Sequence, residues 1–173
     1  MPETKDLILK KAVFEDWPDI YHNLWQHWES ARYMLWSVTE SEEEARDRMR
    51  RTLAWQASHD YMYFVYEKAS GKAFGFAGMK EIAPGIWEEA GVGLGPDFVG
   101  RGYGGQILDK LTELAFSLGG KEFQASCRAE NERSHRLILS RGFVPTGQEQ
   151  CVDERNGEEY TLLHFSLPAP ERP

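Results

Sequence analysis

Gly100-Arg101-Gly102-Tyr103-Gly104-Gly105 is the stretch of this chain that constrains its fold most. Residues 90–96, just before it, read as a short strand that stops at a Gly-Pro pair. Residues 106–118, just after it, place apolar side chains at the spacing of one helix face, and Gly119-Gly120 is expected to end that helix. The stretch is therefore predicted to be a loop that joins a strand to the start of a helix.

This glycine loop has the properties of an anion-binding site. The first amides of a helix lack intrahelical partners and lie at the positive end of the helix dipole. Glycines leave room for a phosphate to reach those amides, and Arg101 could add a charged donor. The alternative is a loop whose glycines only allow tight packing. The residues predicted to bind phosphate are Gly100, Arg101, Gly102, Tyr103, Gly104 and Gly105.

Gly100, Gly102 and Gly105 also fit the dinucleotide fingerprint G-x-G-x-x-G. That fingerprint requires a parallel βαβ unit with an acidic residue at the end of the next strand, about 20 residues further on. The next predicted strand, residues 122–127, has its acidic Glu122 at the beginning instead. An NAD-dependent enzyme is therefore the least favoured interpretation.

The region before the glycine loop also argues against a dinucleotide-binding fold. Turn signals at Ser70-Gly71 and Pro84-Gly85 connect three predicted strands into an antiparallel meander, which supplies no parallel half. Gly91 and Gly93 in the last of these strands predict a bulge or a close backbone approach. The three strands are expected at residues 61–67, 73–82 and 86–94.

Two helices are predicted in the first third of the chain, after a strand at residues 7–13. Asp16 is expected to cap the first helix, with Pro18 in its first turn and apolar residues extending to Trp28. Ser41 and Glu44 form a capping-box pattern for the second helix, which should run to about residue 58. Its arginines are expected to form a solvated face and no binding patch; they are Arg46, Arg48, Arg50 and Arg51.

The C-terminal third is predicted to contain a helix and a hairpin. The helix opens at Asn131, turns Leu137, Ile138 and Leu139 inward, and ends before Gly142. Asn156-Gly157 is a two-residue hairpin signal between strands at residues 147–152 and 159–167.

A longer pattern resembles a known family. Residues 96–104, then a helix, a strand, Asn131-Glu132-Arg133-Ser134 and Arg141-Gly142-Phe143, are similar to the GCN5-related N-acetyltransferases. Within them the chain resembles the RimJ/RimL-like branch, which acetylates ribosomal-protein N-termini and small amines. The resemblance covers residues 7–167 and is most specific in 89–143. It departs from the family at Val99, where Gln or Arg usually begins the loop.

Chain length predicts one domain, at residues 1–167, and the low-complexity residues 168–173 predict a loose tail. The resemblance implies an α/β fold with a mixed, mainly antiparallel sheet flanked by helices. It also implies acetyl-CoA as the co-substrate. In the family the loop amides bind the pyrophosphate, and the pantetheine arm follows the preceding strand, which holds Val92 and Leu94 here. Asn131 and Ser134 would open a helix beside the cofactor.

Glu89 is the candidate general base, because the resembling branch carries a glutamate at this place. Glu88 should face the opposite side of the strand, so at most one of the two points into the site. The family's usual acid, a tyrosine seven residues after Asn131, is replaced by Ile138, and Ser134 is the substitute we would name. The alternatives are solvated glutamates and an ordinary first-turn serine.

Aromatic residues in the predicted first helix and after it are candidates for the acceptor pocket. In the acetyltransferase interpretation Trp25, Tyr33 and Trp36 lie over the bound amine. The alternative is that they belong to the core, where aromatic residues at helical spacing are often found.

Composition narrows the function classes further. The 173 residues are 41% apolar and 28% charged, as in a globular soluble protein, and their formal net charge is −8. This charge argues against nucleic-acid binding through phosphate neutralisation and would suit amine substrates. No membrane span or signal peptide is expected, two distant cysteines suggest reduced thiols in the cytoplasm, and the five histidines show no metal spacing.

The sequence therefore predicts an N-acetyltransferase that moves an acetyl group from acetyl-CoA to a primary amine, either a peptide N-terminus or a small molecule. The alternative is a non-catalytic CoA-binding sensor or interaction module on the same fold. Both interpretations leave open whether the chain is a monomer or a homodimer.

Overall fold

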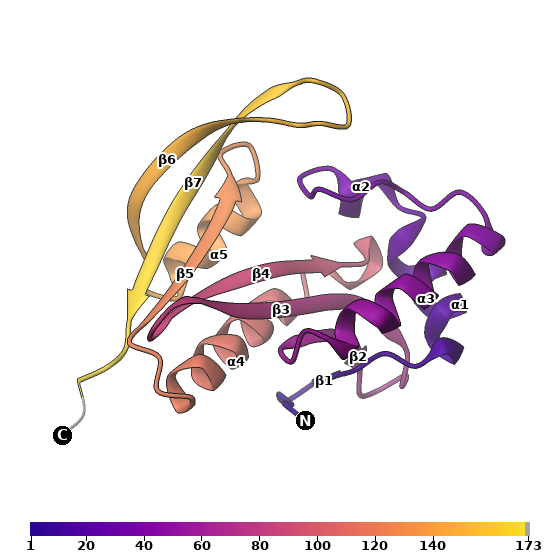
Figure 1. Ribbon diagram of the computed structural model, residues 1–173, viewed down its shortest axis with the longest axis horizontal. Coiled ribbons are helices and arrows are strands. Elements are labelled where there is room, and N and C mark those ends of the chain that lie inside the picture. Colours follow the sequence, from indigo (N-terminus) through magenta and orange to yellow (C-terminus); the bar gives the residue numbers. More distant parts are fainter. Residues whose placement is uncertain (172–173) are drawn as a thin grey trace. The chain divides into compact units, whose positions relative to one another are not determined.

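The computed structural model describes residues 1–171, and its ribbon is drawn in Figure 1. The elements in chain order are β1 (Leu7–Lys10), the 3₁₀ turn η1 (Phe14–Asp16), α1 (Trp17–Ile20), the π-helix η2 (Tyr21–Trp25), α2 (Trp28–Ala31), α3 (Glu42–Ala57), β2 (Met62–Glu67), β3 (Ala73–Ala83), β4 (Ile86–Leu94), the 3₁₀ turn η3 (Pro96–Phe98), α4 (Tyr103–Ser117), β5 (Glu122–Arg128), α5 (Glu132–Ser140), β6 (Val144–Val152) and β7 (Glu159–Pro168).

The strands form a seven-stranded mixed sheet in the order β1-β2-β3-β4-β5-β7-β6. The pairing of β4 with β5 is parallel, and the pairings β1–β2, β2–β3, β5–β7 and β6–β7 are antiparallel. This confirms the predicted mixed, mainly antiparallel sheet. The chain divides into two compact units, described in turn below: Met1–Met79 with Ala90–Lys110, and Lys80–Glu89 with the residues from Leu111 onward.

The first unit is built on β1, β2 and the first part of β3. Leu7 pairs with Glu67 and Met62 pairs with Gly78, so each strand runs antiparallel to its neighbour. The predicted turn at Ser70-Gly71 is present, and Gly71 has a φ of 73°, which glycine adopts without strain. The core of this unit joins the strands to the helices and contains Ala12, Ile20, Tyr21, Leu24, Trp25, Ala45, Met49, Phe64, Tyr66 and Ala73.

Asp16 is the N-cap residue of α1, but the capping bond expected from its side chain is absent. Its carboxylate accepts hydrogen bonds from the Val13 amide and the Tyr66 hydroxyl instead of from the first amides of α1. The single helix predicted through Trp28 is also wrong, since α1 gives way to the π-helix η2 and then to the separate short helix α2. Pro18 does lie in the first turn of α1.

Helix α3 confirms the capping prediction at its start. The Ser41 hydroxyl accepts a hydrogen bond from the Glu44 amide at 3.1 Å. The Glu44 carboxylate accepts a hydrogen bond from the Glu40 amide, one residue before the expected partner. Such a cap stabilises a helix by about 1 kcal/mol.

The second unit contains β5, α5 and the long β6–β7 hairpin, shown in orange and yellow in Figure 1. Its core includes Trp87, Phe123, Phe143 and Phe165, and the Phe123 and Phe143 rings meet edge to face at 6.2 Å. Ile138 is buried as predicted, whereas Leu139, predicted to face inward, is 43% exposed.

The predicted hairpin is present, with Val152 paired to Glu159, but its connection is longer than two residues. The Asp153 and Gly157 backbone groups close it, since the Gly157 amide donates to the Asp153 carbonyl at 2.7 Å. Strand β7 extends to Pro168, the first residue of the predicted tail; of that tail, residues 172–173 lie outside the described residues.

Candidate active site

The glycine loop has the predicted form, and α4 begins within it at Tyr103. Gly100 and Gly102 have φ values of 77° and 80°, in the left-handed region that other residues rarely adopt. A Cβ added at either position would meet no atom within 4 Å, so neither glycine is required by packing. The packing-only alternative is therefore not supported at these two residues.

The amides at the start of α4 are available to a ligand. The Gln106 amide donates to the Gly102 carbonyl, which makes it the first amide with an intrahelical acceptor. The amides of Tyr103, Gly104 and Gly105 precede it and therefore have none within the helix. With open space over Gly100 and Gly102, this loop fits a phosphate or pyrophosphate group.

Glu67, at the end of β2, holds the loop in place. The residue is 8% exposed, and its carboxylate accepts hydrogen bonds from Arg101 at 3.0 Å and from the Tyr103 hydroxyl at 2.8 Å. Arg101 also donates to the Asp97 carbonyl at 2.9 Å. The guanidinium predicted to face a phosphate is thus occupied with positioning the loop. Sequence reasoning missed Glu67, because it lies 34 residues before Arg101 and no local pattern marks it.

Val92 and Leu94 lie in the last part of β4, before the loop. The Leu94 carbonyl accepts a hydrogen bond from the Ser30 hydroxyl at 2.8 Å, and the Gly95 amide donates to the Phe74 carbonyl at 2.9 Å. The Phe76 ring packs so closely over Gly93 that an added Cβ would lie 2.4 Å from it. A Cβ added at Gly75 of β3 would lie 2.5 Å from the Gly93 carbonyl, and this is the close backbone approach predicted from the strand glycines.

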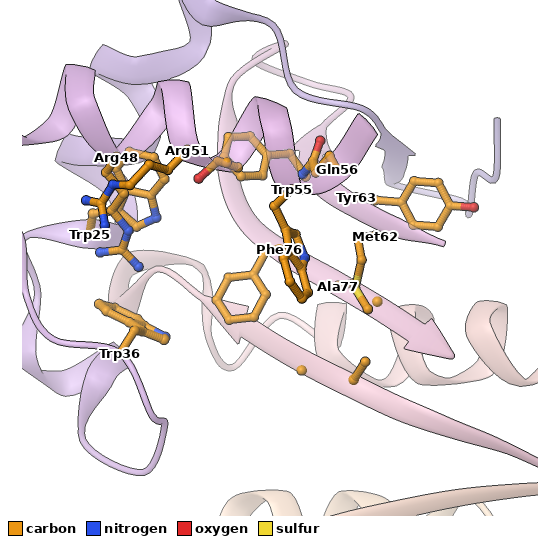
Figure 2. Close-up of a pocket in the computed structure, with 15 residues that line it drawn as sticks. Trp25, Trp36, Arg48, Arg51, Trp55, Gln56, Met62, Tyr63, Phe76 and Ala77 are labelled. Carbon is orange, nitrogen blue, oxygen red and sulfur yellow. The ribbon is translucent and has the colours of Figure 1, made fainter. Parts of the chain in front are cut away.

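A cavity of about 430 Å³ lies in the first unit and is shown in Figure 2. Trp25 and Trp36, two of the three aromatic residues predicted for the acceptor pocket, belong to its lining. Tyr33 is not among the lining residues; its ring lies 4.9 Å from the Arg32 guanidinium. Sequence reasoning missed the other aromatic walls, Trp55, Tyr63, Phe64 and Phe76.

Two α3 arginines also line this cavity. The predicted solvated face is wrong for Arg48, which is half-buried, whereas Arg51 is exposed as predicted. The Arg48 guanidinium lies between two tryptophans, 4.5 Å from the Trp25 ring and 4.8 Å from the Trp36 ring (Figure 2). Arg46 and Arg50 do lie at the surface, paired with Glu42 and Asp47. A sequence signal existed, because Arg48, Thr52 and Trp55 fall three to four residues apart on one helix face.

The two candidate bases, Glu88 and Glu89, differ in their surroundings. The Glu88 carboxylate forms an ion pair with Lys80 at 3.7 Å, with both side chains partly exposed. Burial and the nearby Glu89 charge together raise the pKa of the Cys127 thiol to about 11. Glu89 is not among the described residues that line the cavity, so its assignment as the base stays a prediction from the resemblance.

Asn131 and Ser134 adopt the helix start that the sequence predicted. The Asn131 side chain caps α5 by accepting a hydrogen bond from the Ser134 amide at 3.3 Å. Ser134 is half-buried in the first turn, and the next residue, His135, packs its ring 5.4 Å from the Phe165 ring.

Within residues 1–171, no group of three or more His, Cys, Asp or Glu side chains could hold a metal ion. Over the same part of the chain, no helix has the length and apolar character needed to cross a bilayer. Cys127 and Cys151 are both free thiols.

Comparison with known proteins gives a family match. The model of the acetyltransferase (GNAT) domain matches residues 6–144. The uncharacterized N-acetyltransferase p20 of Bacillus licheniformis is 26% identical over 170 residues, which cover 95% of this chain and 93% of that protein.

Solved structures show the same fold. The Microcin C7 self immunity acetyltransferase MccE, solved with acetyl-CoA and AMP, aligns with a TM-score of 0.81 and 19% identity over 96% of this chain and 94% of its own. The ribosomal L7/L12 α-N-protein acetyltransferase RimL, solved with coenzyme A, aligns with a TM-score of 0.78 and 20% identity over 96% of both chains. These likenesses confirm the predicted fold.

Proposed function

This chain belongs to the GNAT acetyltransferase family, and we propose that it moves the acetyl group of acetyl-CoA directly to a primary amine, with no covalent enzyme intermediate. The acceptor would be a peptide N-terminus or a small-molecule amine. We place this activity in residues 1–167.

The glycine loop is the observation that carries the proposal. Its left-handed Gly100 and Gly102 have open space at their Cβ positions and directly precede the first α4 amides, as suits a pyrophosphate site. Glu67 fixes the loop through Arg101 and Tyr103, so the amides are positioned before a ligand arrives. The acetyl-CoA in the MccE structure supports this choice of cofactor.

Acetyl-CoA, when bound, supplies an activated acetyl thioester. The acceptor nitrogen must lose its proton before it can attack, and we assign that proton to the Glu89 carboxylate, directly or through water. We assign the return of a proton to the departing sulfur to the Ser134 hydroxyl. Val92 and Leu94 would contact the pantetheine arm through their backbone, and Asn131 would support the cofactor from the start of α5.

The cofactor assignment is tested by thermal unfolding with acetyl-CoA, free CoA and NADH. A ligand at a hundred times its Kd stabilises the folded state by about 2.7 kcal/mol, which raises Tm by roughly 5–10 °C in a chain of this size. We expect this shift with acetyl-CoA and CoA and none with NADH. A shift with NADH alone would overturn the assignment.

One observation favours a second candidate, a non-catalytic CoA-binding module. Ile138 stands where the family usually carries the tyrosine that acts as general acid. Isoleucine has no proton to donate, and this one is buried, with 5% of its surface exposed. Such a module would bind acetyl-CoA without releasing thiol in the presence of any amine.

A further inference from the structure

The cavity of the first unit has a charge opposite to that of the whole chain. The formal net charge of the protein is −8, yet the charged residues that line the cavity are Arg48 and Arg51. Within the described residues 1–171, no Asp or Glu belongs to the lining. A site built for a simple cationic amine would place carboxylates there, because like charges repel.

The two arginines differ in how many contacts the protein makes with their guanidinium groups. Arg48 stacks between Trp25 and Trp36 and donates to the Thr39 hydroxyl at 3.0 Å. Burial and the charge of Arg51 lower the pKa of Arg48 to about 10, so it stays protonated at neutral pH beside a second cation.

Arg51 has no internal partner: in residues 1–171 its guanidinium forms no hydrogen bond, ion pair or ring contact. It lies on the cavity wall, on the same helix as Arg48, and its planar group can hold a carboxylate or phosphate through two parallel hydrogen bonds. An oxyanion bound there would also relieve the repulsion between the two guanidinium groups.

The remaining walls suit an apolar group. Trp55 is 54% exposed, and Trp36 and Phe76 are half-buried, so each presents ring surface to the cavity. Figure 2 shows these rings together with Met62, while the two arginines gather beside Trp25. A volume of about 430 Å³ lies within the range of roughly 300–1,000 Å³ that small-molecule sites occupy.

We propose that the acceptor is an amine that also carries an oxyanion, a carboxylate or a phosphate, next to an apolar or aromatic group. Arg51 would bind the oxyanion, with Arg48 as the second positive charge, and the tryptophan and phenylalanine rings would contact the apolar part. The inference rests on the proposed acetyl transfer and adds the chemical class of its acceptor.

The test compares matched amines that differ in their anionic group. L-Phenylalanine is paired with 2-phenylethylamine, the dipeptide Ala-Phe with its C-terminal amide, and tyramine phosphate with tyramine. Thiol release from acetyl-CoA gives kcat and KM for each compound. The first two pairs report on a carboxylate at two distances from the amine, and the third reports on a phosphate.

The matched variants are Arg51→Gln in the cavity and Arg50→Gln at the surface, where Arg50 is paired with Asp47 and 61% exposed. We expect the anionic member of at least one pair to have the lower KM. Arg51→Gln should raise that KM about 10- to 100-fold and leave the KM of the neutral amine and of acetyl-CoA unchanged. Arg50→Gln should change none of these three KM values.

Two results would overturn the inference and leave acetyl transfer intact: neutral amines preferred in every pair, or Arg51→Gln weakening both members equally. Quenching of tryptophan fluorescence reports binding separately from acetyl transfer, because three of the six tryptophans line the cavity. Absence of thiol release combined with quenching by the anionic compounds, abolished in Arg51→Gln, would support the oxyanion site and refute the transfer reaction. Absence of both signals would overturn the site as well.

Discussion

Two neighbouring glutamates, Glu88 and Glu89, show that a shift of one residue along a strand changes the surroundings of a side chain. Glu88 pairs with Lys80 at the surface, whereas the charge of Glu89 acts on the buried Cys127 thiol. Side chains alternate between the two faces of a strand, so the two carboxylates lie in different environments. This difference makes Glu88 the natural control for Glu89.

Replacement of Glu89 by Gln should lower kcat mainly at lower pH, by about 100-fold if Glu89 is a general base. At low pH the acceptor amine is protonated and needs a base, whereas at high pH it has already lost its proton. The measurement is a pH profile of thiol release. Glu88→Gln should follow the wild-type profile, and wild-type rates for Glu89→Gln at low pH would remove Glu89 as the base.

The α3 arginines show what a sequence leaves undecided at the scale of residues. Arg46 and Arg50 are solvated as predicted, and so is Arg51, although it also lines the cavity; Arg48 alone is half-buried there. Charge pattern alone favours solvent for all four, because a buried guanidinium is rarely found without partners. The partners of Arg48 are the ring faces of Trp25 and Trp36, which come from a different part of the chain.

At the scale of elements, the glycine loop and α4 could be predicted well, because their signals are local. Glycines at positive φ and an apolar helix face lie within 20 consecutive residues, roughly one supersecondary unit. The break between α1 and α2 was not predicted, since the apolar pattern continues through the π-helix η2 to Trp28 and marks no interruption. The longer β6–β7 connection likewise depends on the tertiary contacts of Asp153.

Replacement of Gly102 by Val should weaken acetyl-CoA binding at least tenfold, because a side chain would enter the open space before the α4 amides. Left-handed backbone strain adds about 1–2 kcal/mol. Gly157→Val is the matched control, since Gly157 has a φ of 75° and equally open surroundings in the β6–β7 connection. Calorimetric titration should show lost affinity for Gly102→Val alone, and equal loss in both would assign the effect to strain.

The β6–β7 hairpin contains a buried ion pair that makes a pH-dependent prediction. Asp153 contacts Arg155 at 2.8 Å and Arg128 at 3.0 Å, and the Arg128 and Asp153 side chains are less than a tenth exposed. Hydrogen bonds from Arg155 and Arg128 hold the Asp153 pKa well below its usual range. The folded state therefore favours the ionised carboxylate, and its contribution is present above the ordinary Asp pKa and lost as pH falls toward the depressed one.

Asp153→Asn should thus lower Tm by several degrees at pH 7, and the gap to wild type should narrow as the pH falls below about 4. Thermal unfolding across this pH range is the measurement. Asp47→Asn, which removes a solvated pair with Arg50, should leave Tm nearly unchanged. A gap of constant size from pH 7 to pH 3 would mean that packing, and not ionisation, accounts for the loss.

At the scale of the whole molecule, the family resemblance predicted the mixed sheet, and the strand order and the solved relatives agree with it. The acceptor is less accessible to sequence reasoning. The net charge of −8 favours a basic amine, whereas Arg48 and Arg51 in the cavity favour an amine with an oxyanion. Net charge averages over the surface, and recognition depends on the few side chains that line a site.

Amine-dependent release of free thiol from acetyl-CoA, with mass spectrometry of the amine, tests the central claim most directly. The account predicts thiol release above the uncatalysed rate and a matching gain of one acetyl group on the amine. An increase in Tm with acetyl-CoA but no thiol release across the whole amine panel would contradict catalysis and identify a CoA-binding module instead.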